Sequence, residues 1–171
     1  AGYPGVTRLI VGVCLFFSAI AAAQDFAPGS TNEISIPELP NPVVVYVPTD
    51  YEASKAWPMV FHYHGTTGQP NVRVAQSYTD GEGFILVGME FTQRGTPKAT
   101  PEFFEAEVAA FAKVRDQIGT KVRIDRDRLY VGGFSKGGWI ASTLAEAYLP
   151  DLAGVILLGA GKTPFTVKAP M

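Results

Sequence analysis

The chain has 171 residues, which fits a single domain, and its hydrophobic content of 47% favours a packed core over disorder. Its formal net charge is −2, and acidic and basic residues are interspersed without a basic cluster. This pattern excludes the electrostatic footprint of a nucleic-acid-binding protein and of a protein held on an anionic membrane surface. It favours a small-molecule or neutral polymeric partner.

Residues 1–23 have the layout of a secretory signal peptide. Arg8 precedes an apolar run over residues 9–17, and small residues close the segment. The run is shorter than the roughly 20 apolar residues that span a bilayer, which argues against a membrane anchor. Cleavage at its end leaves Gln24 first, so we expect a secreted or periplasmic protein with no membrane segment after signal removal. The one cysteine, Cys14, lies inside the signal, so we expect neither a disulfide nor thiol chemistry.

The rest of the chain is predicted to be a short linker followed by one domain. Residues 24–32 are polar and contain a Pro and a Gly, which is typical of a linker, and residues 33–171 form the domain. Strand patterns in the domain cover residues 33–39, 43–47, 59–64, 84–88, 128–132 and 153–158. The first two strands are expected to pair antiparallel across a proline-containing turn.

Two helices are predicted between the later strands. The first covers residues 100–119, with Thr100 as N-cap and Pro101 at the first helical position. The second covers residues 136–148. The first helix is expected to turn an apolar stripe toward the core that consists of Phe104, Val108, Phe111 and Ile118. Buried strands that alternate with helices predict an α/β fold, with a mainly parallel sheet and helices on both faces.

A serine lies between the fifth of these strands and the second helix, in the sequence Gly-Phe-Ser-Lys-Gly at residues 133–137. The pattern G-x-S-x-G in this context is typical of a nucleophile elbow, a sharp strand-to-helix turn that exposes the serine hydroxyl above the sheet. Ser135 is therefore the predicted nucleophile. The alternative is a glycine-rich turn with an ordinary capping serine.

A second loop complements this turn. Residues 62–68 read His-Tyr-His-Gly-Thr-Thr-Gly and follow the strand expected near the sheet centre. An oxyanion hole needs two backbone N–H groups aimed at one oxygen, one after the nucleophile and one from this early loop. Lys136 and Thr66 are the predicted donors. Gly65 and Gly68 are expected to give the loop backbone angles that other residues resist.

These features resemble a known family. The resemblance rests on Pro-Thr-Asp-Tyr at residues 48–51, Trp-Pro at 57–58, His-Gly at 64–65, and Asp-Arg-Asp-Arg-Leu-Tyr-Val-Gly-Gly-Phe-Ser-Lys-Gly-Gly at 125–138. Over about residues 41–161, the chain looks like secreted α/β-hydrolase esterases of the feruloyl esterase and polyhydroxybutyrate depolymerase-like group. The resemblance implies the α/β-hydrolase fold, a small-molecule or polymeric ester substrate, and no cofactor or metal. It also implies an acyl-enzyme on Ser135, and a loop braced by His64 next to Gly65.

One departure from that family bears on activity. The triad of this fold follows the order Ser, then Asp or Glu, then His, yet no histidine follows Ser135. The only later acid, Asp151, precedes a strand and is expected at the opposite edge of the sheet. We therefore expect that the C-terminal strands and helices of the domain are missing and that the 171-residue chain alone is inactive. Two other functions stay open, a non-catalytic binding protein with this fold and a serine peptidase.

Other chemical roles are weighed against simpler ones. His62 and His64 point to one face of a strand, but no third metal ligand is evident near them. His64 as a replacement base is disfavoured because it precedes the serine and is expected beneath the loop. The Lys136 side chain is expected in solvent. Four aromatic residues are expected to pack in or beside the core rather than to contact substrate, namely Trp57, Phe103, Phe104 and Trp139.

Overall fold

A computed structural model describes residues 26–95 and 98–161, so the expected signal peptide at residues 1–23 lies outside the described residues. The elements in chain order are β1 (Thr31–Ile34), β2 (Val43–Tyr46), β3 (Trp57–Tyr63), α1 (Arg73–Thr79), β4 (Ile85–Met89), α2 (Pro101–Gly119), β5 (Ile124–Phe134), α3 (Lys136–Tyr148), η1 (Leu149–Asp151) and β6 (Gly154–Leu158). Within the described part of the chain, no helix has the length and hydrophobicity to cross a membrane.

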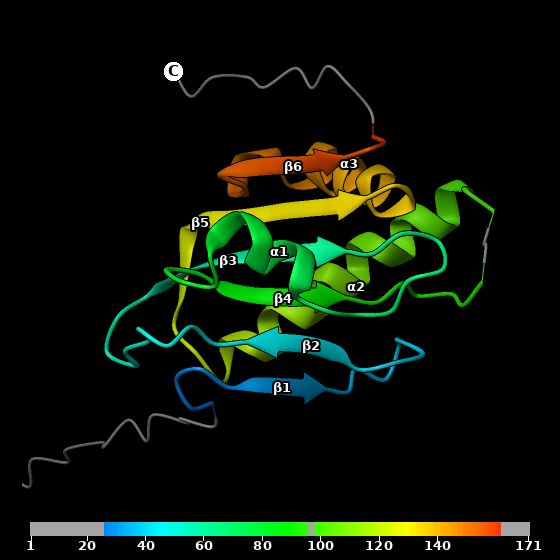
Figure 1. Cartoon of the computed structure of the whole chain (residues 1–171). Coiled ribbons are helices and arrows are strands. Elements are labelled where there is room, and N and C mark those ends of the chain that lie inside the picture. The colour runs from blue at the N-terminus through cyan, green and yellow to red at the C-terminus, as the bar shows by residue number, and fades with distance from the viewer. Residues whose placement is uncertain (1–25, 96–97, 162–171) are drawn as a thin grey trace, which may run out of the picture.

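The strands form one mixed sheet in the order β1-β2-β4-β3-β5-β6 (Figure 1). The neighbours β4, β3, β5 and β6 run parallel, whereas β1 and β2 pair antiparallel and join the sheet at β4. The expected mainly parallel sheet is therefore confirmed. The first strand is shorter than expected and ends at Ile34, because Pro37 and Pro40 have no N–H to extend the ladder through residues 35–39.

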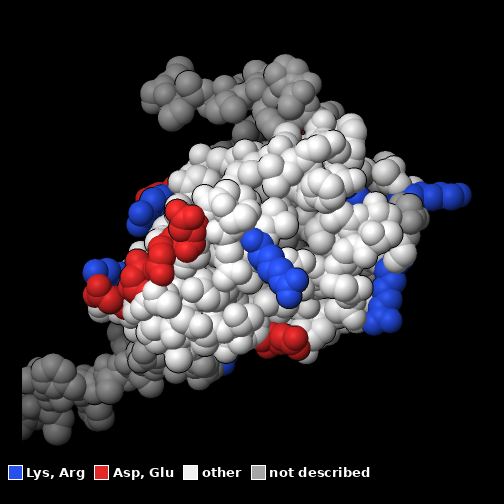
Figure 2. Space-filling view, viewed as in Figure 1, with Lys and Arg blue, Asp and Glu red and all other residues white. Residues whose placement is uncertain are grey.

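Helices cover both faces of the sheet, as expected. Figure 1 shows α2 and α3 behind the sheet and α1 in front of it. The larger core cluster lies on the α2 and α3 side, and a smaller one around Val60, Val72, Ala75 and Leu86 lies under α1. Figure 2 shows that the α1 side of the molecule carries few charged side chains. Helix α1 was not predicted, since Ala75 is its one buried residue and leaves no apolar stripe to recognise.

Part of the expected linker is packed against the domain. Phe26 is buried, and the Gly29 amide donates to the Val47 carbonyl at 2.9 Å. Thr31 then begins β1. Residues 26–32 are therefore structured, because Phe26 contributes to the main core and the backbone bonds to the end of β2.

Helix α2 has the expected start and a wider buried face than expected. The Phe103 amide donates to the Thr100 side chain at 3.3 Å, as expected of an N-cap. The side chains buried against the sheet are Phe103, Glu107, Ala110, Phe111, Val114 and Ile118. Phe104 and Val108 are half-buried and pack against the main core, so the expected stripe does face the core. The buried face also includes Glu107, a polar residue that was not expected there.

The first turn of α3 lies against the ends of β3 and β5 without room for side chains. A Cβ placed on Gly137 meets the Tyr63 carbonyl oxygen at 2.3 Å and the His64 carbonyl oxygen at 2.7 Å. A Cβ on Gly133 meets the Gly137 carbonyl carbon at 2.1 Å. Backbone atoms cannot swing aside as a side chain does, so these glycines fix the distance between helix and sheet.

We expect Gly137→Ala to destabilise the domain by at least about 3 kcal/mol because of this backbone clash. An unobstructed Gly→Ala change inside a helix stabilises by about 1 kcal/mol, so the expected sign is reversed. Urea denaturation measures the free energy of unfolding. The matched control is Gly83→Ala, where φ is +72° but no atom lies within 4 Å of the added methyl. That variant should lose only about 1–2 kcal/mol. A more stable Gly137→Ala protein would show that the helix can move away.

Candidate active site

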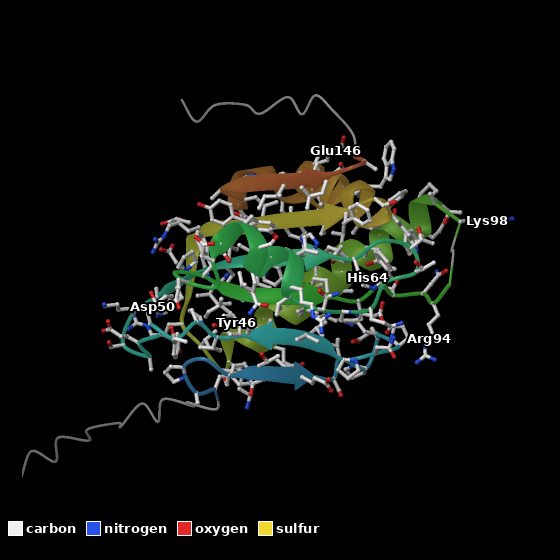
Figure 3. The ribbon with its side chains drawn as sticks, viewed as in Figure 1. Tyr46, Asp50, His64, Arg94, Lys98 and Glu146 are labelled. Atoms are coloured by element: carbon white, nitrogen blue, oxygen red, sulfur yellow. The ribbon has the colours of Figure 1, made fainter. Side chains whose placement is uncertain are left out.

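Three adjacent parallel strands each end one residue before a side chain of chemical interest. Strands β4, β3 and β5 end at Met89, Tyr63 and Phe134, and the next residues are Glu90, His64 and Ser135. In the ladder, Tyr63 pairs with Met89 on one side and with Gly133 on the other. Figure 3 shows His64 and Arg94 at this edge of the sheet and Asp50 at the opposite edge. The carboxyl ends of parallel strands are where open α/β sheets collect their ligands.

Ser135 has the backbone conformation of a tight strand-to-helix turn. Its φ is +52°, a region that a residue other than glycine adopts at a cost of about 1–2 kcal/mol. Two hydrogen bonds hold the turn, from the Ser135 amide to the Leu158 carbonyl at 2.9 Å and from the Gly138 amide to the Ser135 carbonyl at 2.9 Å. The serine is half-buried and α3 begins at the next residue, so its side chain lies at the positive end of the helix dipole.

A cavity of about 510 Å³ opens next to this serine. It is lined by Thr66, Ala99, Phe103, Phe104, Ser135, Lys136, Trp139 and Ile140. Phe103 belongs to the main core and Phe104 packs against it, as expected, but both also line this cavity together with Trp139. Phe103 and Phe104 reach the cavity from the first turn of α2, and Trp139, half-exposed, reaches it from α3. Trp57 packs in the main core, as expected.

The backbone amides of Thr66 and Lys136 are both unused at this cavity. Neither amide donates a hydrogen bond to any acceptor among residues 26–95 and 98–161. Lys136 is the first residue of α3, where intrahelical partners are lacking, and Thr66 lies in the turn after β3. Two free donors therefore belong to residues that line the same cavity as Ser135.

The glycines of the Thr66 loop have a different role from the one expected. Neither Gly65 nor Gly68 has a positive φ. Instead, a Cβ on Gly68 meets the His64 Cβ at 2.8 Å, and a Cβ on Gly65 meets the Phe134 ring at 3.1 Å. The loop needs glycine because it curls tightly against these two side chains, and not because of a backbone angle.

His64 is engaged at both ring nitrogens. Nδ1 donates to the Gly65 carbonyl at 2.6 Å, and Nε2 lies 3.1 Å from Oε1 of Glu90. The ring packs edge-on against Phe91, with centroids 4.5 Å apart. Ser135 has no hydrogen bond to either histidine of the chain within the described residues, so His64 does not act on it as a base in this arrangement.

Glu90 is a buried carboxylate that sequence reasoning missed. Its side chain is 5% exposed and accepts hydrogen bonds from His64, from Asn41, and from the Phe91 amide at 2.8 Å. Burial pushes the pKa of Glu90 up, but these hydrogen bonds more than offset burial and leave the pKa below the usual glutamate value. The available signal was its place directly after the buried strand β4, whose last residue, Met89, pairs with Tyr63, the residue before His64.

Lys136 is also placed differently from the expectation, because its ammonium is not in solvent. Nζ is buried without a hydrogen-bond partner among the described residues, 4.1 Å from the ring centroid of Phe91 and 5.2 Å from that of Phe103. Burial lowers the pKa of Lys136, while Glu107 and Glu90 oppose that shift. Aromatic faces attract a desolvated cation, which explains how the ammonium is held there.

Glu107 supplies a second buried carboxylate from α2. It is 1% exposed, and its Oε1 accepts from the Thr92 amide at 2.7 Å and from the Thr92 hydroxyl at 2.8 Å. Burial raises the pKa of Glu107, and the Thr92 hydrogen bonds and the charge of Lys136 pull it back down. His64, Glu90, Glu107 and Lys136 thus form a cluster of buried ionisable groups beneath the loop.

His62 belongs to the other face and has separate partners. It is 2% exposed, and Nδ1 lies 3.3 Å from the Tyr78 hydroxyl of α1. Burial first, and the nearby His64 second, lower the pKa of His62 to about 4. No group of three His, Cys, Asp or Glu residues in the described chain is placed to hold a metal ion.

No protein-family model matches the sequence, and no curated protein sequence matches it. Solved structures resemble it in fold. A ferulic acid esterase from the anaerobic fungus Anaeromyces mucronatus has a TM-score of 0.55 at 16% identity, over 79% of this chain and 61% of that chain. Acetyl xylan esterase from Aspergillus awamori has a TM-score of 0.61 at 18% identity, over 74% of this chain and 50% of that chain. A feruloyl esterase module from Clostridium thermocellum, solved with sinapinate, has a TM-score of 0.55 at 17% identity, over 80% of this chain and 56% of that chain.

These likenesses show the α/β-hydrolase fold that the sequence predicted. The chain spans between 50% and 61% of the length of the three solved chains.

We expect the buried His62 to make the domain sensitive to mild acid. An unfolded histidine titrates near pH 6.5 and the folded one near pH 4, so stability is complete above pH 6.5 and is lost as the pH falls toward 4. The loss attributable to His62 should be on the order of 3 kcal/mol. Urea denaturation gives the free energy of unfolding at pH 7 and at pH 4. The drop between the two pH values should be smaller in His62→Leu than in the unmodified protein by about 3 kcal/mol. Parallel losses in both proteins would contradict the assignment.

Proposed function

We propose that the protein is a serine hydrolase that cleaves carboxylic esters through an acyl-enzyme on Ser135. The observation that carries the proposal is the positive φ of Ser135, in a glycine-lined turn beside a cavity with two free backbone amides. The hydroxyl oxygen attacks the ester carbonyl carbon, the alcohol leaves, and water then releases the acid from the serine. Both half-reactions pass through a tetrahedral oxyanion.

In this proposal the Lys136 and Thr66 amides donate hydrogen bonds to that oxyanion. Lys136 directly follows the nucleophile, so its N–H and the serine oxygen come from one rigid turn. The N-terminus of α3 adds a fixed dipole that favours the developing negative charge. His64 and Gly65 have a supporting role and keep the Thr66 loop in place.

The general base and its acid partner are proposed to come from outside the described residues. Both histidines of the chain are described, and each is engaged elsewhere. The 171-residue chain alone is accordingly expected to be inactive, because an unassisted serine hydroxyl stays protonated near neutral pH. The lack of a base in contact with Ser135 also supports a second candidate, a hydrolase-fold protein that binds a ligand without cleaving it.

The cavity supports an ester with an apolar acid part. Three aromatic side chains line it, and such walls favour flat or hydrophobic groups. The solved relatives that the chain resembles are named for ferulic acid and acetyl xylan esters. We propose an ester substrate, small or polymeric, with no cofactor and no nucleic-acid partner.

We further propose that the protein is exported, secreted or periplasmic, with residues 1–23 removed. Sequencing the N-terminus of material recovered from the extracellular or periplasmic fraction should give Gln24 as the first residue. Recovery only inside the cell, with Arg8 retained, would rule out export.

The central test is Ser135→Ala in the full-length protein that contains this sequence. We expect p-nitrophenyl ester turnover to fall by about 10⁶-fold, because the covalent route is lost. A fluorophosphonate should label the unmodified protein at Ser135 and leave the variant unlabelled. Ester turnover that survives in Ser135→Ala would falsify the assignment. Binding of an aromatic acid with no turnover in either protein would favour the non-catalytic candidate.

A further inference from the structure

We propose that Glu90 is a positioning residue that orients the Thr66 amide toward the ester carbonyl, acting through His64 and the peptide group between Gly65 and Thr66. This inference rests on the proposed function. Glu90 touches neither the cavity beside Ser135 nor the reacting atoms, so its effect has to pass through the residues between.

A continuous chain of hydrogen bonds leads from Glu90 to the loop. Oε1 of Glu90 lies 3.1 Å from Nε2 of His64, and Nδ1 of His64 donates to the Gly65 carbonyl oxygen at 2.6 Å. The same oxygen accepts from the Gly68 amide at 3.0 Å, which closes the turn. Both His64 and Glu90 are more than nine-tenths buried, which makes these hydrogen bonds stronger than exposed ones.

The position of the Gly65 carbonyl oxygen sets the direction of the Thr66 N–H, because both belong to one peptide group. The Gly65 carbonyl and the Thr66 N–H belong to one planar trans peptide, in which C=O and N–H point in opposite directions. A carbonyl held on the His64 side therefore turns the Thr66 N–H away from His64. Thr66 lines the cavity of Ser135, and its amide is unused within the described chain.

The hydrogen-bond pattern strengthens this donor. Both ring nitrogens of His64 face oxygen atoms, the Gly65 carbonyl at Nδ1 and the Glu90 carboxyl group at Nε2. The hydrogen bond from Nδ1 polarises the Gly65 carbonyl, and hydrogen bonds along one peptide reinforce each other.

Other groups around the pair hold Glu90 in place. Asn41 donates to its second oxygen, and Arg94 donates to the Asn41 side chain at 3.1 Å. Lys136 from α3 and Glu107 from α2 complete the charged groups of the cluster. The Asn41 contact ties the segment before β2 to the end of β4 and restrains the carboxylate.

The test is Glu90→Gln in the full-length protein, assayed with an ester and with the matching thionoester. A thiocarbonyl sulfur accepts hydrogen bonds weakly, so thionoester turnover depends little on the Thr66 donor. Loss of a whole oxyanion donor costs about 10²–10³ in kcat, and we expect misorientation to cost about tenfold for the ester. Thionoester turnover should change by less than about twofold, and KM for the ester should stay within about twofold.

Two further variants keep the test interpretable. Glu38→Gln makes the same chemical change at an exposed glutamate that pairs with Lys113, and it should leave both substrates unaffected. Asn41→Ala removes one bond to Glu90 and leaves His64 in contact, so it should lower the ester-to-thionoester ratio in the same direction by a smaller factor. It serves in place of Glu90→Gln if that variant does not fold. Equal loss with both substrates, or no loss with either, overturns the proposal.

A second readout separates this inference from the proposed function. In nitrogen-15 NMR spectra of the full-length protein, Glu90→Gln should shift the signals of the Thr66 amide and of the His64 ring nitrogens. If the unmodified protein shows no ester turnover, the proposed function fails, and these signals still decide whether Glu90 orients the loop. An unchanged Thr66 amide overturns the positioning role whether or not the protein is an esterase.

Discussion

The candidate site depends on a single steric condition, the absence of side chains where the first turn of α3 meets the sheet. Carbonyl groups of Tyr63 and His64 lie where a Cβ on Gly137 would be, and Gly133 packs on the backbone of the same turn. This contact brings the end of β3, the end of β5 and the start of α3 together. The Thr66 loop, the Ser135 turn and the free Lys136 amide are neighbours only because these three backbones touch.

Electrostatics is the second ordering influence at this edge. Two carboxylates and two basic side chains lie beneath the loop, from β4, α2, the end of β3 and the start of α3. An isolated buried charge is costly, but here two acids lie near two bases, and each group is held by hydrogen bonds or aromatic rings. The cluster therefore adds polar contacts between segments that also share the apolar core.

Much of the fold was predictable from sequence, because buried parallel strands are continuous apolar runs. Strands β3, β4, β5 and β6 were each predicted within a few residues, and α3 was predicted with its observed bounds. The Ser135 turn was recognisable because its glycines flank the serine at fixed spacing, although the catalytic role of Ser135 remains a prediction. Helix α1 was missed because it buries one small residue.

The surroundings of the serine were less predictable, and the errors share a cause. The Lys136 side chain was expected in solvent, and no local pattern indicated that Glu90 or Glu107 would be buried. Their pairing depends on which strands are neighbours, and no local sequence pattern predicts the order β4-β3-β5. The aromatic lining of the cavity was not predicted for the same reason, since Phe103 and Trp139 line it together only because α2 and α3 pack on one face of the sheet.

The residues of the Ser135 turn and those of the cavity wall tolerate substitution differently. The positions that admit no side chain, such as Gly133 and Gly137, belong to the turn, whereas Phe104 and Trp139 reach the cavity from the surfaces of two helices. Substitutions at the wall leave the backbone contacts of the turn intact. The shape of the cavity wall can therefore change through Phe104 and Trp139 without a side chain entering the backbone contacts around the serine.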